Sequence, residues 1–159
     1  MTSSPSVAAP VPAEQVDAVV AATQVVGGLI AESLAAVQPA VTVPQWRVLV
    51  LASRGSSNVS AVAEDLGVHA SNATRICDRL VALGLLSRRR SPDDRRHVLL
   101  VLTEEGQRFV DEAMGHRRDR VEQAMACLAE DHREVLADAL SEFASALSVV
   151  HGEAAARAV

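Results

Sequence analysis

The residues with the most evident chemistry are arginines gathered in one stretch of the chain. Five of them fall within the nine residues from Arg88 to Arg96, and every one of the 15 basic residues is Arg rather than Lys. A guanidinium group offers a planar fork of N–H donors that matches phosphate oxygens and base edges, so the cluster indicates an anionic partner. A merely solvated hairpin is the alternative, but unpaired like charges repel one another. Codon bias toward Arg would explain the absence of Lys equally well.

The overall charge of the chain conceals this cluster. The formal net charge is −5, yet residues 69–103 hold seven Arg against three Asp, whereas residues 104–159 hold six Arg against twelve acidic residues. A basic island of net +4 therefore lies within an acidic protein. Such an island is typical of a nucleic-acid-binding surface.

Other kinds of chemistry find little support in the composition. Aromatic residues make up only 2% of the chain, which argues against a stacking platform for single-stranded nucleic acid. The five His residues are scattered, so neither a metal site nor any other cofactor is expected. Cys77 and Cys127 are expected to be small buried packing residues rather than redox sensors. No nucleophile elbow or phosphate loop appears, so an enzyme is not expected.

The length of the chain fits one domain with tails. The 159 residues are 49% apolar, enough for a packed core. We expect no membrane span and no secretory signal, and therefore a cytoplasmic protein. Residues 1–12 are small, polar and proline-bearing, and we expect them to form a mobile arm.

Helical spacing of apolar residues predicts four helices before the arginine cluster. The first spans 13–38 and is ended by Pro39, with Gly27 and Gly28 in its middle. These glycines are either a tolerated weakness or a point of close approach for another helix or a ligand. A Thr42 cap begins the second helix, an Asn58 cap begins a short third helix, and the fourth covers about 70–83.

The period then changes from helical to alternating. Residues 85–90 and 97–102 predict two strands joined by a turn at 91–96. Thr103 is expected to cap a long helix, and residues 131–134 to begin a final one. The order predicts a mainly α protein with a small β wing, in which a helix-turn-helix precedes a two-stranded hairpin. The outer helices carry apolar stripes that this small module could not cover, which favours a second copy of the chain.

These segments resemble the MarR family of winged helix-turn-helix regulators over roughly residues 13–150. The resemblance rests on Pro44-Gln45-Trp46-Arg47-Val48-Leu49, on Val62-Ala63-Glu64-Asp65-Leu66-Gly67-Val68, and on Ser71-Asn72-Ala73-Thr74-Arg75 with Asp78-Arg79-Leu80 and Gly84-Leu85-Leu86. The most specific match is Asp93-Asp94-Arg95-Arg96 followed by Leu102-Thr103-Glu104-Glu105-Gly106. The resemblance implies a single domain over 13–151. Within it, the winged helix-turn-helix lies at about 42–103 and dimerisation helices lie at about 13–38 and 104–151.

The resemblance also implies a function. A homodimer would bind a near-palindromic operator in double-stranded DNA, usually as a repressor, with half-sites about one helical turn apart. Release by a small aromatic effector or by oxidation is common in the family. A ligand-binding protein without DNA activity remains the alternative, although it would not need the basic island.

The fourth predicted helix supplies the expected base contacts. Asn suits adenine and Arg suits guanine, so Asn72 and Arg75 are candidates together with Ser71 and Thr74. Ser71 and Asn72 could equally serve only at the helix start or on phosphates. Asp78 is expected to orient a neighbouring Arg, and His69 stands where the family often has a Ser cap.

The hairpin supplies the remaining expected contacts. The resemblance implies that Arg96 enters the minor groove and that Asp94 holds it by a salt bridge. Arg88, Arg89, Arg90 and Arg95 are expected to contact phosphates, with some of them facing away because side chains alternate along a strand. An effector pocket would include Trp46, Met114 and His116, although Trp46 fits a core position at least as well.

Overall fold

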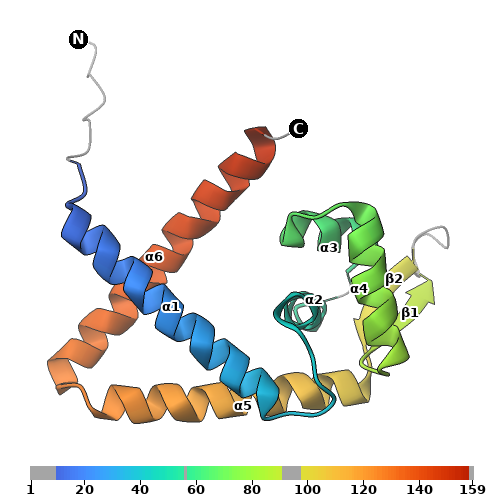
Figure 1. Ribbon diagram of the computed structural model, residues 1–159, viewed down its shortest axis with the longest axis horizontal. Coiled ribbons are helices and arrows are strands. Elements are labelled where there is room, and N and C mark those ends of the chain that lie inside the picture. Colours follow the sequence, from blue (N-terminus) through green and yellow to red (C-terminus); the bar gives the residue numbers. More distant parts are fainter. Residues whose placement is uncertain (1–9, 56, 91–97, 158–159) are drawn as a thin grey trace. The chain divides into compact units, whose positions relative to one another are not determined.

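The computed structural model of the protein describes residues 10–55, 57–90 and 98–157 (Figure 1). Over these residues it contains helices α1 (Ala13–Ala35), α2 (Val43–Ser53), α3 (Val59–Leu66), α4 (Ala70–Ala82), α5 (Glu104–Ala126) and α6 (Glu130–Arg157), and strands β1 (Leu86–Arg90) and β2 (Val98–Leu102). The predicted order of helices and strands is confirmed. The chain forms two compact units, residues 1–117 and 118–159, so α5 runs from one unit into the other.

Local sequence signals account for the helix boundaries in the first unit. The Thr42 Oγ1 accepts from Gln45 N (3.5 Å) while Gln45 Oε1 accepts from Thr42 N (2.9 Å), which completes a capping box at the start of α2. Asn58 Oδ1 caps α3 by accepting from Ala61 N at 2.9 Å. Gly67 ends α3 with φ = 66°, a left-handed conformation that favours glycine. α1 ends at Ala35, before the predicted residue 38, because the residues preceding Pro39 disfavour helix.

A buried apolar core holds the helix-turn-helix together. Fully buried side chains come from α2, α3, α4, β1 and β2, among them Val48, Leu49, Val62, Ala73, Cys77, Leu80, Leu86 and Leu100, together with Leu85 just before β1. Burial of such side chains contributes roughly 1.5–3 kcal/mol each, so this core fixes the orientation of α4. Cys77 is buried as predicted, whereas Cys127 is exposed, which corrects that expectation.

The two strands form an antiparallel hairpin that pairs Leu86 with Leu102 and Arg90 with Val98. A short third segment adds to it, since Leu100 N donates to Ser57 O at 2.6 Å and Ser57 N donates to Leu100 O at 3.2 Å. This bridge was not predicted, because the residues around Ser57 look like a simple loop. It fixes the hairpin to the chain that follows α2.

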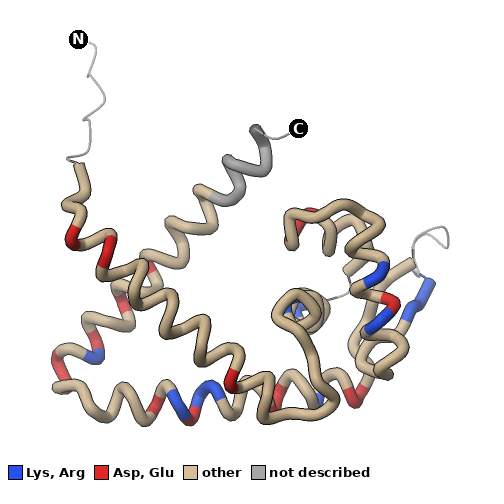
Figure 2. Tube along the Cα trace, in the orientation of Figure 1, with Lys and Arg blue, Asp and Glu red and all other residues tan. Residues whose placement is uncertain are grey.

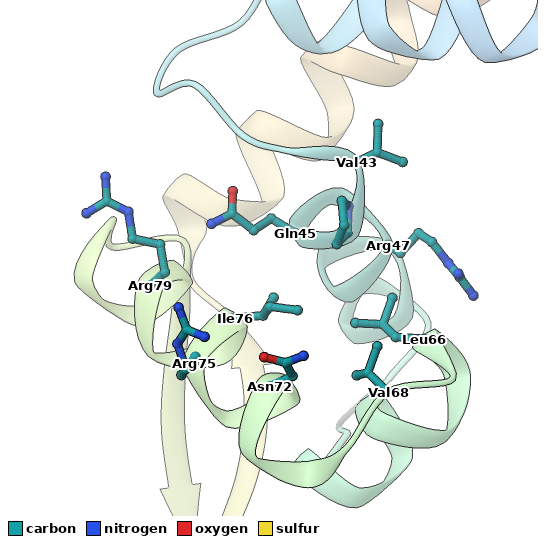
Figure 3. A pocket seen from close by; sticks show the side chains of 10 residues that line it. Val43, Gln45, Arg47, Leu66, Val68, Asn72, Arg75, Ile76 and Arg79 are labelled. Atoms are coloured by element: carbon teal, nitrogen blue, oxygen red, sulfur yellow. The ribbon is translucent and has the colours of Figure 1, made fainter.

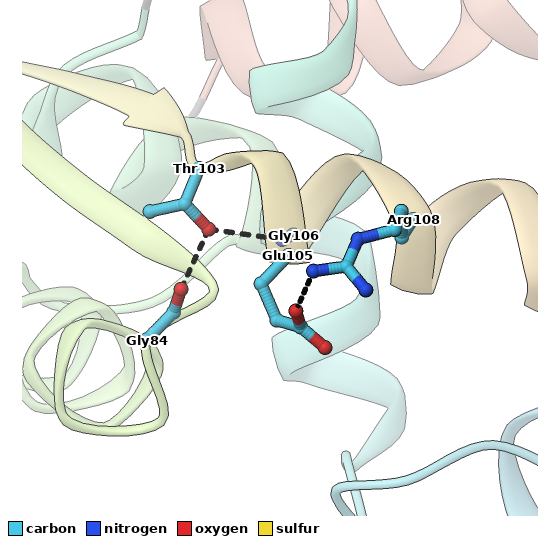
Figure 4. Close-up of polar contacts among 5 residues, drawn as sticks. All are labelled: Gly84, Thr103, Glu105, Gly106 and Arg108. Carbon is cyan, nitrogen blue, oxygen red and sulfur yellow. Dashed lines mark hydrogen bonds and ion pairs between the residues drawn. The ribbon is translucent and has the colours of Figure 1, made fainter.

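The start of α5 is bonded to the turn that follows α4 (Figure 4). Thr103 Oγ1 donates to Gly84 O at 2.6 Å and accepts from Gly106 N at 2.9 Å, so Thr103 caps α5 as predicted. A Cβ on Gly106 would lie 2.0 Å from Leu85 O, closer than any real contact. Only glycine therefore allows this approach, which joins α5 to the turn after α4.

The outer helices expose much of their apolar surface. Among the exposed side chains are Val16, Val19, Val20, Val25 and Val26 on α1, and Val135, Leu136, Leu140, Phe143 and Leu147 on α6. Among the described residues, α1 alone is long and apolar enough to cross a membrane by length and composition, with a mean hydropathy of 1.6. This corrects the expectation that no segment of the chain would meet that test.

Candidate nucleic-acid interface

Helix α4 presents a polar face because its apolar residues are taken up by the core. Ala73, Cys77 and Leu80 are buried, whereas Ser71, Asn72 and Arg75 are exposed. Thr74 is half-buried, and its hydroxyl donates to Ala70 O at 2.8 Å. His69 precedes the helix without a side-chain cap bond. The helix therefore offers short polar groups and one guanidinium along its N-terminal half.

Strand β1 brings further arginines beside this helix. Arg88, Arg89 and Arg90 are exposed, and Arg88 Nη2 lies 2.6 Å from Asp78 Oδ1 on α4. Asp78 thus orients a neighbouring Arg, as predicted. Asp94, Arg95 and Arg96 lie outside the described residues, so their expected roles stay predictions.

The positive charges of this face come from adjacent elements of one compact unit (Figure 2). Within the described residues they are Arg75 and Arg79 on α4 and Arg88 and Arg90 on β1, whereas the alternation of the strand directs Arg89 to the other side of the hairpin. A helix carrying polar groups can enter a major groove, while flanking guanidiniums contact phosphates and supply salt-dependent affinity. The arrangement is chemically suited to double-stranded DNA.

Comparisons with known proteins agree with this geometry. A model of the MarR family matches residues 41–98. The uncharacterized HTH-type transcriptional regulator YfiV of Bacillus subtilis is 30% identical over 107 residues, which cover 67% of each chain. The chain belongs to the MarR family. It is accordingly a DNA-binding transcriptional regulator, with a mainly α fold and a two-stranded wing.

Solved structures of MarR-type proteins share the fold. RV1404 from Mycobacterium tuberculosis superimposes with a TM-score of 0.78 at 33% identity, covering 87% of this chain and 97% of that one. CouR from Rhodococcus jostii RHA1, solved with bound p-coumaroyl-CoA, gives a TM-score of 0.58 at 28% identity, covering 77% and 87%.

The residues expected to contact an effector are only partly brought together. Trp46 is 4% exposed, and the Arg117 guanidinium lies 5.0 Å from its ring centre. Arg117 also donates to Ser33 Oγ (3.1 Å) and to Met114 Sδ (3.7 Å). Trp46 and Met114 therefore share one neighbour, whereas His116 is exposed and has no bond to any of them in the described part of the chain.

Arg117 is a residue that the sequence pattern did not single out. Burial lowers the pKa of its guanidinium, because the charged form loses hydration. Its Nε is buried and has no hydrogen-bond partner among the described residues. The signal that could have found it is its position three residues after Met114, on the same face of α5.

A hollow on the α4 side of the first unit was also missed (Figure 3). It has a volume of about 640 Å³ and lies between α2, the end of α3 and α4. Asn72 and Arg75 line it, so part of the expected DNA-contacting face borders a cavity. The local sequence pattern could not reveal it, since three separate elements form its walls.

Proposed function

We propose that the protein is a cytoplasmic transcriptional repressor that binds a near-palindromic operator as a homodimer and is released by a small ligand. Residues 13–151 would act as one MarR-type domain. The observation that carries the proposal is the exposed polar face of α4, held by a buried core beside the arginines of β1. A repressor acts by occupying a promoter, and the polar face of α4 with the arginines of β1 is suited to bind that DNA.

The proposed base contacts lie on α4. Asn72 is suited to adenine and Arg75 to guanine, each through two hydrogen bonds in the major groove. Ser71 contacts a base or a phosphate. Thr74 acts as an acceptor, because its hydroxyl proton is engaged with Ala70 O.

The proposed hairpin contacts position the protein on the duplex. Arg88, Arg90 and Arg95 contact phosphates, whereas Arg96 enters the minor groove and is held by Asp94. Asp78 keeps Arg88 in place at the side of α4. Phosphate contacts of this kind fix the register without carrying sequence information.

The homodimer is supported by the apolar surface that the chain leaves exposed. Phe143 is 38% exposed, and both α1 and α6 carry further large apolar side chains in contact with solvent. An exposed apolar helix face of this kind usually marks an interface. Two copies related by a twofold axis would place two α4 helices on successive major grooves.

A small aromatic effector is supported by the surroundings of Trp46. Its ring stacks with Arg117, and Met114 and His116 lie on the neighbouring stretch of α5. The similar protein CouR was solved with p-coumaroyl-CoA, an aromatic ligand. We propose the region of Trp46, Met114 and His116 as the effector contact.

Operator selection tests the proposed function. The purified protein is incubated with random duplexes, and bound molecules are amplified and sequenced over several rounds. We expect an inverted repeat whose half-site centres are about one helical turn apart. Enrichment of no sequence over bulk DNA would overturn the proposal, and a single unrepeated half-site would overturn the dimeric mode of binding.

A further inference from the structure

We propose that Arg117 sets the spacing between the two operator half-sites that the protein recognises. This role rests on the proposed function, because half-site spacing is defined only for a dimer on an inverted repeat. Arg117 is a positioning residue that does not contact DNA. It fixes α1, a proposed dimerisation helix, against α2 of the helix-turn-helix through directional contacts.

Arg117 lies where three helices of the first compact unit meet. It is the last residue of α5 in that unit, and its guanidinium lies 5.0 Å from the ring centre of Trp46 on α2. Arg117 Nη2 donates to Ser33 Oγ on α1 at 3.1 Å. The Ser33 hydroxyl donates in turn to Ile30 O at 2.8 Å, which leaves the lone pairs of its oxygen to accept from Arg117. One side chain therefore joins α1, α2 and α5.

This three-helix contact is shielded from solvent. Ser33 and Trp46 are 3% and 4% exposed. Burial lowers the pKa of the Arg117 guanidinium, because the charged form has lost hydration. A hydrogen bond from a charged donor is stronger where the surroundings are less polar than water. The contact can therefore hold α1 at a defined angle to α2.

Folding stability does not account for a charge at this position. The Nε of Arg117 is buried without a hydrogen-bond partner among the described residues, and Ser33, Met114 and Trp46, which its guanidinium contacts, are neutral. A buried charge without a full set of partners lowers stability, and an apolar side chain of similar size is often as good or better. Such a side chain would lack the directional bond to α1.

Helix α1 is anchored to the core at one end only. Its buried and half-buried side chains are Leu29, Ile30, Ser33 and Leu34, whereas residues 13–28 are exposed. The apolar part of this anchor has no preferred direction. The exposed 16 residues extend about 24 Å beyond the anchor. A rotation of about 8° at the anchor therefore moves the far end by about 3.4 Å, the rise of one base pair.

The angle of α1 acts on the operator through the symmetry of the proposed dimer. A twofold axis repeats the same angle in both chains, so the angle sets the separation of the two α4 helices. With the Arg117 contact in place, one spacing brings both α4 helices into successive major grooves. Without it, α1 can pivot, and neighbouring spacings become accessible.

Spacing variants of the selected operator test the proposal. Both half-sites are kept, and the spacer between them is shortened or lengthened by one base pair. The wild type should bind either altered duplex at least about tenfold more weakly, because one half-site then shifts and turns away from its α4 helix. Arg117→Met and Ser33→Ala should lose less than about threefold. A dimeric Arg117→Met variant with the spacing preference of the wild type would overturn the proposal.

Arg118→Met is the matched control, because it removes the same charge from the next position of α5, which is exposed. It should keep the spacing preference of the wild type. If it lost that preference as Arg117→Met does, charge alone would explain the effect and the proposal would fail. Combining Arg117→Met with Ser33→Ala should relax the preference no further, since both changes remove one contact. If Arg117→Met does not fold, Ser33→Ala decides, because it deletes a single oxygen atom.

A distance measurement on the protein alone separates this role from the proposed function. Spin labels are attached at Asp17→Cys on α1 and Glu64→Cys on α3, both exposed positions, in a Cys127→Ser background, and labelled chains are diluted with unlabelled ones. The distribution of distances should be broader with Arg117→Met than in the wild type and unchanged with Arg118→Met. Equal widths in all three would overturn the pivot. If selection yields no inverted repeat, the proposed function fails, while this measurement still decides whether Arg117 fixes α1.

Discussion

The ion pair between Arg88 and Asp78 shows how a single contact can serve orientation more than stability. The two side chains are 40% and 52% exposed and lie 2.6 Å apart. Exposed pairs of this kind contribute roughly 0–1 kcal/mol to folding, because solvent screens the charges. The value of the contact lies in fixing one guanidinium of the hairpin against α4, where the proposed DNA backbone passes.

Arg96 provides the residue-level test of the hairpin contacts. Arg96→Ala should weaken operator binding by roughly 1–3 kcal/mol without affecting dimer stability, because it removes the guanidinium proposed to enter the minor groove. Arg54→Ala is the matched control, since it removes the same charge from an exposed position outside the proposed interface. Mobility-shift titrations measure both. Unchanged affinity in the Arg96 variant would show that its assignment is wrong.

The two cysteines should differ in reactivity and in their effect on stability. Burial raises the pKa of the Cys77 thiol above its ordinary value of 9.0. At pH 8 a thiol reagent should therefore modify exposed Cys127 quickly and Cys77 only after unfolding. Fast modification of two thiols in the native protein would contradict the burial of Cys77.

The raised pKa of Cys77 predicts that its contribution to folding stability depends on pH. The pKa of the Cys77 thiol is higher in the folded protein than in the unfolded chain. Its contribution to folding stability is therefore full below the unfolded-state pKa and declines as pH rises through the folded-state pKa. In a Cys127→Ser background, the stability advantage of Cys77 over Cys77→Ala should therefore shrink above about pH 9. Urea unfolding between pH 7 and 10.5 measures it, and a constant difference would contradict the prediction.

At the scale of elements, the bonded junction between the α4 turn and α5 couples two parts of the fold. Thr103 bonds to Gly84 and to Gly106, and the backbone of α5 comes so close to Leu85 that no side chain fits at Gly106. The start of α5 is therefore held tightly against the turn that follows α4.

Gly106→Ala tests this junction. The added methyl group would meet the Leu85 carbonyl at 2.0 Å, and the resulting backbone shift should cost about 3 kcal/mol of folding stability and weaken operator binding. Gly115→Ala on the same helix meets nothing within 4 Å and should gain up to about 1 kcal/mol from helix propensity. Denaturant unfolding compares the two. A Gly106 variant as stable as the Gly115 variant would mean that the approach is not tight.

Features set by neighbouring residues were predictable, and features set by distant ones were not. Capping by Thr42, Asn58 and Thr103 follows from short-range hydrogen bonds. Helical period indicated that Ala73 and Leu80 face the core, whereas Thr74, expected among the DNA contacts, is half-buried. The contact between Arg117 and Ser33 joins residues 84 positions apart, and no local pattern encodes it. The bridge at Ser57 and the walls of the hollow likewise depend on tertiary packing.

At the scale of the whole molecule, the exposed apolar surface and the charge distribution point to an assembly. The basic island lies in the helix-turn-helix and hairpin, while α1 and α6 combine acidic and apolar residues. Two copies joined through these outer helices would keep both basic faces free. The acidic remainder would then limit non-specific adsorption to DNA.

Leu140→Arg tests the dimer directly. Leu140 is 56% exposed on α6, so a charge there costs an isolated chain little, but burying it in an interface without a partner should cost several kcal/mol. We expect the wild type to sediment as a dimer with a melting temperature that rises with protein concentration, and the variant to sediment as a monomer without that dependence.

Ser145→Arg is the control for this prediction, because it adds the same side chain on the side of α6 away from the apolar stripe. It should remain dimeric and bind the operator as the wild type does. If the wild type is monomeric at the concentrations that saturate the operator, the twofold mode of recognition is wrong. The apolar surface of α1 and α6 would then require a different partner, while the DNA-contacting face of α4, built within one chain, would stand unchanged.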